Sequence, residues 1–141
     1  MNDQFLATPS RPDIADLTPA DAAALGAAAG LQGFAVFELD GASMRTKPEL
    51  MDHAALKLAF PGDFGKNWDA MVDYLGDMAT IHKNSKILIF VRAPEKIGSS
   101  DPRLRADLLK VFGFACDNAR EWSKHSVILK FALVWPDKCV I

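Results

Sequence analysis

Lys86-Ile-Leu-Ile-Phe-Val91 is a nearly unbroken apolar run in the second half of the chain. A strand has this pattern when helices cover it or when it lies centrally in a parallel sheet. The run therefore predicts a central strand. Residues 34–39 and residues 126–134 have apolar strand patterns of their own, ended by the turn pair Asp40-Gly41 and by Pro136, respectively.

Helical patterns fill the two intervals between these strands. In the first, Leu50, Ala54 and Leu58 share one helix face, and Asn67 can cap a second helix over residues 68–79. In the second, a long helix carries one apolar face, made of Leu104, Leu108, Val111, Phe112, Ala115, Ala119 and Trp122. Strands separated by helices imply right-handed crossovers and a parallel sheet. The sequence thus predicts a two-layer α/β fold, a small three-stranded parallel sheet packed with helices.

The N-terminal region differs in pattern from the rest of the chain. Residues 1–16 contain Pro9 and Pro12 and have no periodicity, so we predict a flexible N-terminal arm there. Residues 17–141 are predicted to form a single domain, since 50% of the chain is apolar and 24% is charged. Its Ala-rich residues 19–29 predict a helix that packs at the periphery, because the apolar face is thin.

Charge and targeting signals exclude several classes of protein. The net charge is −2, which argues against direct binding of nucleic acid, because phosphate contacts need an excess of Lys and Arg; it permits a basic protein partner. No secretory signal is visible, and the apolar runs are too short for a membrane span. We expect Cys116 and Cys139 to be free thiols, with an intermolecular disulfide as the alternative, in a cytoplasmic protein.

The helix predicted after Asn67 has one strongly acidic side. At about 100° per residue, Asp69, Asp73 and Asp77 line the side opposite its apolar residues. Like charges at this spacing repel one another by roughly a few tenths of a kcal/mol per pair, and no Lys or Arg lies among them. The pattern fits a binding face, and it equally fits the solvated face of an ordinary amphipathic helix.

The same segment contains a short, unusual motif. It consists of Phe60-Pro61, Phe64-Gly65, Asn67-Trp68-Asp69-Ala70 and Asp73, and it is similar to the pattern of the barstar-like family of ribonuclease inhibitors. The resemblance covers about residues 34–135. It implies that the loop and the first half of the helix enter the phosphate-binding cleft of a small, basic, secreted ribonuclease. By the same resemblance Asp69 and Asp73 are the principal charge contacts, and Gly65 and Asn67 shape the loop.

Three positions depart from the family pattern. Asp63 stands where the family has an aromatic residue, Val72 where it has a tryptophan, and Phe114 where it has a further acid. Phe114 lies near the edge of its helix's apolar face, so it is either a core residue or an exposed contact. These changes bear on the identity of the partner more than on the mode of binding.

Catalytic motifs are not evident in the sequence. His53, His82 and His125 lie in three separate segments without metal-ligand spacing, and there is no phosphate-binding glycine loop or nucleophile elbow. We therefore predict a non-enzymatic protein without metal or cofactor, and the resemblance implies that it inhibits a basic guanyl-type ribonuclease. The alternative is a barstar-like interaction module with a non-ribonuclease partner or a homo-oligomer contact.

Overall fold

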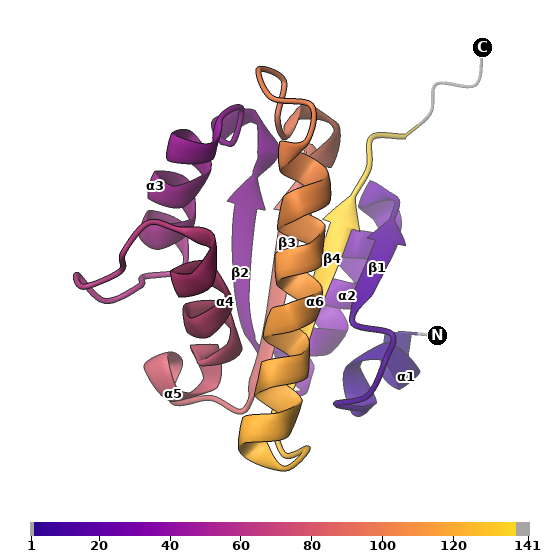
Figure 1. Ribbon diagram of the computed structural model, residues 1–141. Coiled ribbons are helices and arrows are strands. Elements are labelled where there is room, and N and C mark those ends of the chain that lie inside the picture. Colours follow the sequence, from indigo (N-terminus) through magenta and orange to yellow (C-terminus); the bar gives the residue numbers. More distant parts are fainter. Residues whose placement is uncertain (1, 138–141) are drawn as a thin grey trace.

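The computed structural model describes residues 2–137 (Figure 1). Along the chain, it has α1 (Asn2–Ala7), β1 (Ile14–Leu17), α2 (Pro19–Leu31), β2 (Ala35–Asp40), α3 (Lys47–Lys57), α4 (Trp68–Gly76), α5 (Met78–His82), β3 (Lys86–Arg92), α6 (Leu104–Ser123) and β4 (Ile128–Val134). Short 3-10 turns, Gly41–Ser43 and Pro94–Lys96, follow β2 and β3. Cys139, predicted to be a free thiol, lies outside the described residues.

One parallel sheet has the strand order β1-β4-β3-β2. Ile89 in the middle of β3 is opposite Phe37 of β2 on one side and Phe131 of β4 on the other. Residues 87–91 are all buried, which explains the unbroken apolar run. The three predicted strands and their parallel direction are confirmed.

The prediction of a three-stranded sheet is wrong, because residues 14–17 form a fourth strand. β1 pairs with β4, and the backbone N–H groups of Phe131 and Trp135 donate to the carbonyls of Asp13 and Leu17, each at 2.9 Å. These bonds join backbone atoms, so they leave no periodic side-chain pattern in so short a strand. The strand and α1 occupy the segment for which we expected a flexible arm.

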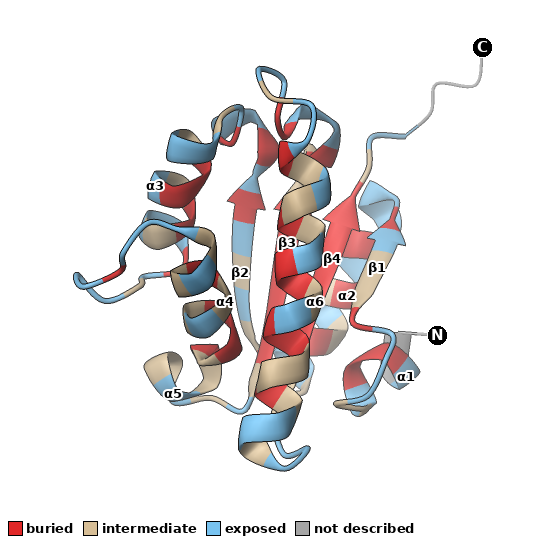
Figure 2. Ribbon diagram, in the orientation of Figure 1, coloured by how far each residue is buried: buried red, intermediate tan, exposed pale blue. Residues whose placement is uncertain are grey.

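Helices cover both faces of the sheet, so the two-layer prediction is also wrong. α3, α4 and α6 pack on the face that carries Ile87 and Ile89, whereas α1 and α2 pack on the face that carries Leu88 and Phe90 (Figures 1 and 2). The connection from β1 to β2 crosses the sheet in the direction opposite to the later connections. A right-handed crossover therefore requires α2 to lie on the opposite face.

The main core lies between the sheet and α6. Phe112 of α6 stacks on Phe131 of β4 with ring centroids 3.9 Å apart, and the buried Met71 and Leu75 of α4 complete this core. Within residues 2–137, the helices are too short or too polar to cross a bilayer. The front layer thus holds α4 and α6 side by side, with their outer surfaces in solvent (Figure 2).

Candidate functional site

The loop before α4 is anchored by aromatic packing. Phe60, Phe64 and Tyr74 form a cluster in which each pair of ring centroids lies 5.0–5.4 Å apart. The Tyr74 hydroxyl donates to Asp63 Oδ1 at 2.6 Å, and this bond raises the pKa of Tyr74. Asp63, one of the predicted contact residues, therefore ties the exposed loop to α4 and stays on the surface.

The end of the loop is organised by Asn67. Its side-chain oxygen accepts from the Ala70 N–H at 2.8 Å, which confirms the predicted helix cap, and its amide nitrogen donates to the Gly65 carbonyl at 3.4 Å. A Cβ on Gly65 would lie 3.3 Å from that amide nitrogen, so a larger residue would crowd the cap. Lys66 pairs with Asp52 of α3 at 3.0 Å. The loop is thus held at both ends before any partner binds.

α4 is shorter than predicted and lies close to α6. It ends at Gly76 rather than continuing to residue 79, and Asp77 lies at the junction with α5. A Cβ on Gly76 would lie 3.1 Å from Asn118 Cβ and 3.2 Å from Trp122 Cζ3. The absence of a side chain at Gly76 therefore permits the close approach of the two helices.

A shallow hollow lies on the outer surface between α4 and α6. Its volume is about 560 Å³, and it is lined by Asp69, Val72 and Asp73 of α4 and by Phe114, Asp117 and Asn118 of α6. A second hollow continues from it past Trp68 and Lys110. Of the predicted contacts, Asp69, Asp73, Val72 and Phe114 come together here. Asp63, Gly65 and Asn67 lie in the loop that leads into α4, and Asp77 does not line the hollow.

The carboxylates of this hollow differ in whether a cation forms an ion pair with them. Asp69 and Asp73 are exposed one turn apart, and no cation among residues 2–137 forms an ion pair with either. By contrast, Asp117 pairs with both Arg11 and Arg120. The α4 side of the hollow is therefore uncompensated negative charge, whereas its α6 side is neutralised within the chain.

Phe114 lies on the surface of the hollow. Its exposed fraction is 58%, so the interpretation of Phe114 as a core residue is wrong; its role as a contact stays a prediction. Val72 is half-buried beside it. Trp68 is also half-buried, packs on the main core and carries Lys47 Nζ 5.4 Å from its ring centroid. The centre of the face is thus apolar and its α4 edge is acidic.

Sequence reasoning missed three residues of this face. Asn118 lies one helical turn after Phe114, so helical spacing alone could have found it and its neighbour Asp117. Arg11 comes from the N-terminal segment, and its Nη2 donates to Asp117 Oδ1 at 2.9 Å across 106 positions of sequence. No local pattern signals such a contact.

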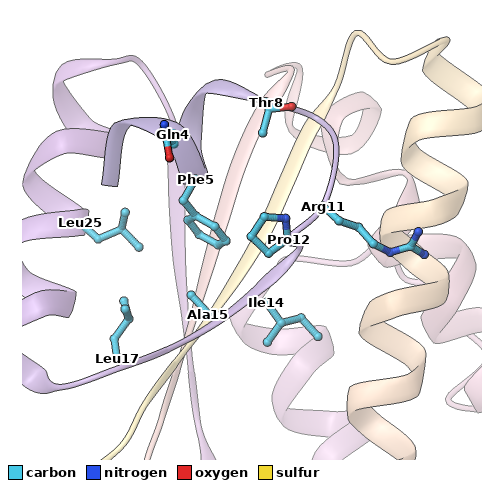
Figure 3. A pocket seen from close by; sticks show the side chains of 9 residues that line it. All are labelled: Gln4, Phe5, Thr8, Arg11, Pro12, Ile14, Ala15, Leu17 and Leu25. Carbon is cyan, nitrogen blue, oxygen red and sulfur yellow. The ribbon is translucent and has the colours of Figure 1, made fainter. Parts of the chain in front are cut away.

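Other parts of residues 2–137 offer fewer side chains suited to binding or catalysis. An apolar pocket of about 460 Å³ lies between α1, α2 and β1, lined by residues such as Phe5, Ile14 and Leu25 (Figure 3). Among residues 2–137, no group of three His, Cys, Asp or Glu side chains is placed to hold a metal ion. His53 Nε2 accepts from the Asp40 N–H at 2.8 Å, and His82 lies against the Leu58 carbonyl, so both have structural partners.

The structure thus defines a parallel α/β protein with an ordered loop and an acidic helix face that no cation of residues 2–137 neutralises. Comparison with protein families matches residues 34–133 to Barstar (barnase inhibitor), and the chain belongs to this family. The resemblance predicted from the motif is confirmed. A comparison with curated proteins found no match. α1, β1 and the whole of α2 precede the matched region.

Proposed function

We propose that this protein inhibits a small, basic, guanyl-type ribonuclease by covering its active-site cleft with the loop before α4 and the first half of α4. The observation that carries the proposal is the pair Asp69 and Asp73. Both are exposed one turn apart, and no cation within residues 2–137 pairs with either of them. A fold selected for stability alone gains nothing from two such unpaired like charges.

A ribonuclease cleft is lined with cations because its substrate is a polyanion. Carboxylates at a suitable spacing can take the places of substrate phosphates and pair with these cations. The loop enters beside them, and its conformation is already held by Asn67, Asp63 and the aromatic cluster, so little ordering is needed on binding. The inhibitor excludes RNA by occupying the cleft and carries out no reaction itself.

The proposed partner indicates the cellular compartment in which the inhibitor acts. A secreted ribonuclease endangers the cell that makes it before export, so its inhibitor is useful in the cytoplasm. A reducing compartment also agrees with Cys116, whose thiol is buried and free, and whose pKa is raised by that burial.

Inhibition of RNA cleavage tests the proposal directly. We expect the protein at micromolar concentration to inhibit barnase or another member of a panel of small basic ribonucleases. The matched control is the variant with both Asp69→Asn and Asp73→Asn, which keeps the shape and removes the charge. Undiminished cleavage throughout the panel would reject ribonuclease inhibition.

A different protein partner, or a second copy of this chain, remains the second proposal. Phe114 favours it, because an exposed aromatic ring beside the acidic pair offers an apolar contact that a cleft built for phosphate does not require. Sedimentation of the purified protein at several concentrations separates self-association from binding to another protein.

A further inference from the structure

Two cations hold the N-terminal segment against the domain: Lys130, which is buried, and Arg120, which is half-buried. Lys130 of β4 is 0% exposed, and its Nζ donates to the carbonyls of Ser10 and Pro12 at 2.7 and 2.6 Å. Arg120 of α6 donates to the Pro9 carbonyl at 3.1 Å and to both carboxylate oxygens of Asp13, at 2.5 and 3.1 Å. The segment is therefore held at two positions on each side of residue 11, through three backbone carbonyls and the side chain of Asp13.

Arg11 is the exposed residue in the middle of this clamped segment. Its side chain is 72% exposed; it borders the apolar pocket and extends from there toward α6 (Figure 3). It reaches Asp117, which lines the hollow between α4 and α6. The N-terminal segment, which lies outside the region matched to the family, thus adds a cation at the border of the acidic face.

The charged residues around Arg11 allow it to leave Asp117 and pair with another carboxylate. Arg11, Arg120 and Lys130 face two carboxylates, Asp13 and Asp117. Arg120 is 12% exposed and already pairs with both carboxylates. Exchange of Arg11 from Asp117 to another carboxylate therefore leaves Asp117 with a partner and no buried charge unpaired.

We infer that Arg11 is a specificity-determining contact that pairs with an acidic side chain on the rim of the partner's basic cleft. The inference rests on the proposed function of the face. The bound ribonuclease then presents cations to Asp69 and Asp73 and a carboxylate to Arg11. Because the clamped backbone fixes where Arg11 emerges, little conformational freedom is lost when the pair forms.

The direction in which affinity changes when Arg11 is removed distinguishes a specific ion pair from long-range electrostatic attraction. Removal of a positive charge from a protein that binds a basic partner strengthens the overall attraction and speeds association. If Arg11 pairs with a carboxylate, however, its removal leaves that carboxylate unpaired and speeds dissociation. The two views predict opposite changes in affinity for the same variant.

The experiment uses surface plasmon resonance with barnase and the other ribonucleases of the inhibition panel as probes. The variants are Arg11→Ala and Arg11→Glu, with Arg103→Glu as the control, since Arg103 is exposed at the start of α6 and lines neither hollow. Thermal unfolding checks that each variant folds. Arg11→Ala tests the inference even where Arg11→Glu disturbs the segment through repulsion from Asp117.

We expect both Arg11 variants to bind the inhibited ribonuclease about tenfold more weakly through faster dissociation, and Arg103→Glu to bind equally or more tightly. Reversal of one acidic rim residue of that ribonuclease to Lys should restore the affinity of Arg11→Glu. Arg11 variants that bind as tightly as wild type, or more tightly, overturn the inference and leave the proposed function intact. Wild-type protein that binds no ribonuclease of the panel overturns both.

Discussion

Phe112 and Phe114 lie two positions apart on α6, and one is 0% exposed whereas the other is 58% exposed. Phe112 stacks on Phe131 in the main core, and Phe114 lies on the hollow beside Asp69 and Asp73. The same aromatic side chain therefore has a folding role at one position and a surface role at the other.

Truncation of each ring is expected to separate these roles. Phe112→Ala should lower the free energy of unfolding by about 3–5 kcal/mol, as large core truncations do. Phe114→Ala should change it by less than about 1 kcal/mol and should weaken partner binding by more than about 1 kcal/mol. Urea denaturation and binding assays measure both quantities, and a large loss of stability in Phe114→Ala would show that its ring supports the fold.

The acidic pair should matter for binding and not for folding. Asp69→Asn and Asp73→Asn are each expected to change stability by at most about 0.5 kcal/mol, because both residues are exposed. Asp69→Asn should be slightly destabilising through the helix dipole, whereas relief of repulsion can make Asp73→Asn stabilising. Each should weaken ribonuclease binding by about 2 kcal/mol or more, the scale of interfacial charge pairs in complexes of this family. Binding equal to wild type would identify the stripe as a solvated face.

The clamp on the N-terminal segment is expected to contribute strongly to stability. Arg120→Met leaves the buried carboxylate of Asp13 without its bidentate partner, and loss of one member of a buried ion pair costs about 3–5 kcal/mol. The exposed Arg103→Met is the control, with a change within about 0.5 kcal/mol. Urea denaturation compares the two variants. A small effect of Arg120→Met would mean that the segment is not required for the stability of the domain.

Two glycines should respond to alanine with opposite signs. Gly76→Ala places a methyl group 3.1 Å from Asn118 Cβ and 3.3 Å from the Ala115 carbonyl, so it should destabilise the protein by about 1 kcal/mol as α4 moves away from α6. Gly113 in the middle of α6 has no atom within 4 Å of the new methyl position. Gly113→Ala should therefore stabilise the protein by about 0.5–1 kcal/mol through helix propensity. Thermal unfolding tests both signs.

His53 should make stability depend on pH. Burial lowers its pKa below the usual 6.5, and its Nε2 accepts from the Asp40 N–H, a bond that only the unprotonated nitrogen can make. The unfolded state therefore binds more protons between the two pKa values, so this contribution is present above about pH 6.5 and is lost as the pH falls toward the folded-state pKa. Denaturation midpoints from pH 5 to 8 measure it. His53→Gln should reduce this dependence, whereas the same change at the exposed His125 should preserve it.

Much of the fold follows from local patterns. The run over residues 86–91, the apolar stripe of α6 and the Asn67 cap depend on neighbours a few positions away, so propensity and periodicity identify them. The sequence also showed that Asp69 and Asp73 share a helix face with no cation among them, and its motif identified the family.

Only the tertiary structure shows the features that depend on contacts between residues far apart in the sequence. β1 has only four residues, and its segment is held by Lys130, which lies 120 positions from Ser10. The 58% exposure of Phe114 and the close approach of α4 to α6 at Gly76 depend on how the helices pack, and the pairing of Arg11 with Asp117 depends on the fold of the whole chain. Backbone pairing and buried ion pairs join residues without any periodic signal, so only the folded chain reveals the fourth strand, the second helical layer and the cation at the edge of the acidic face.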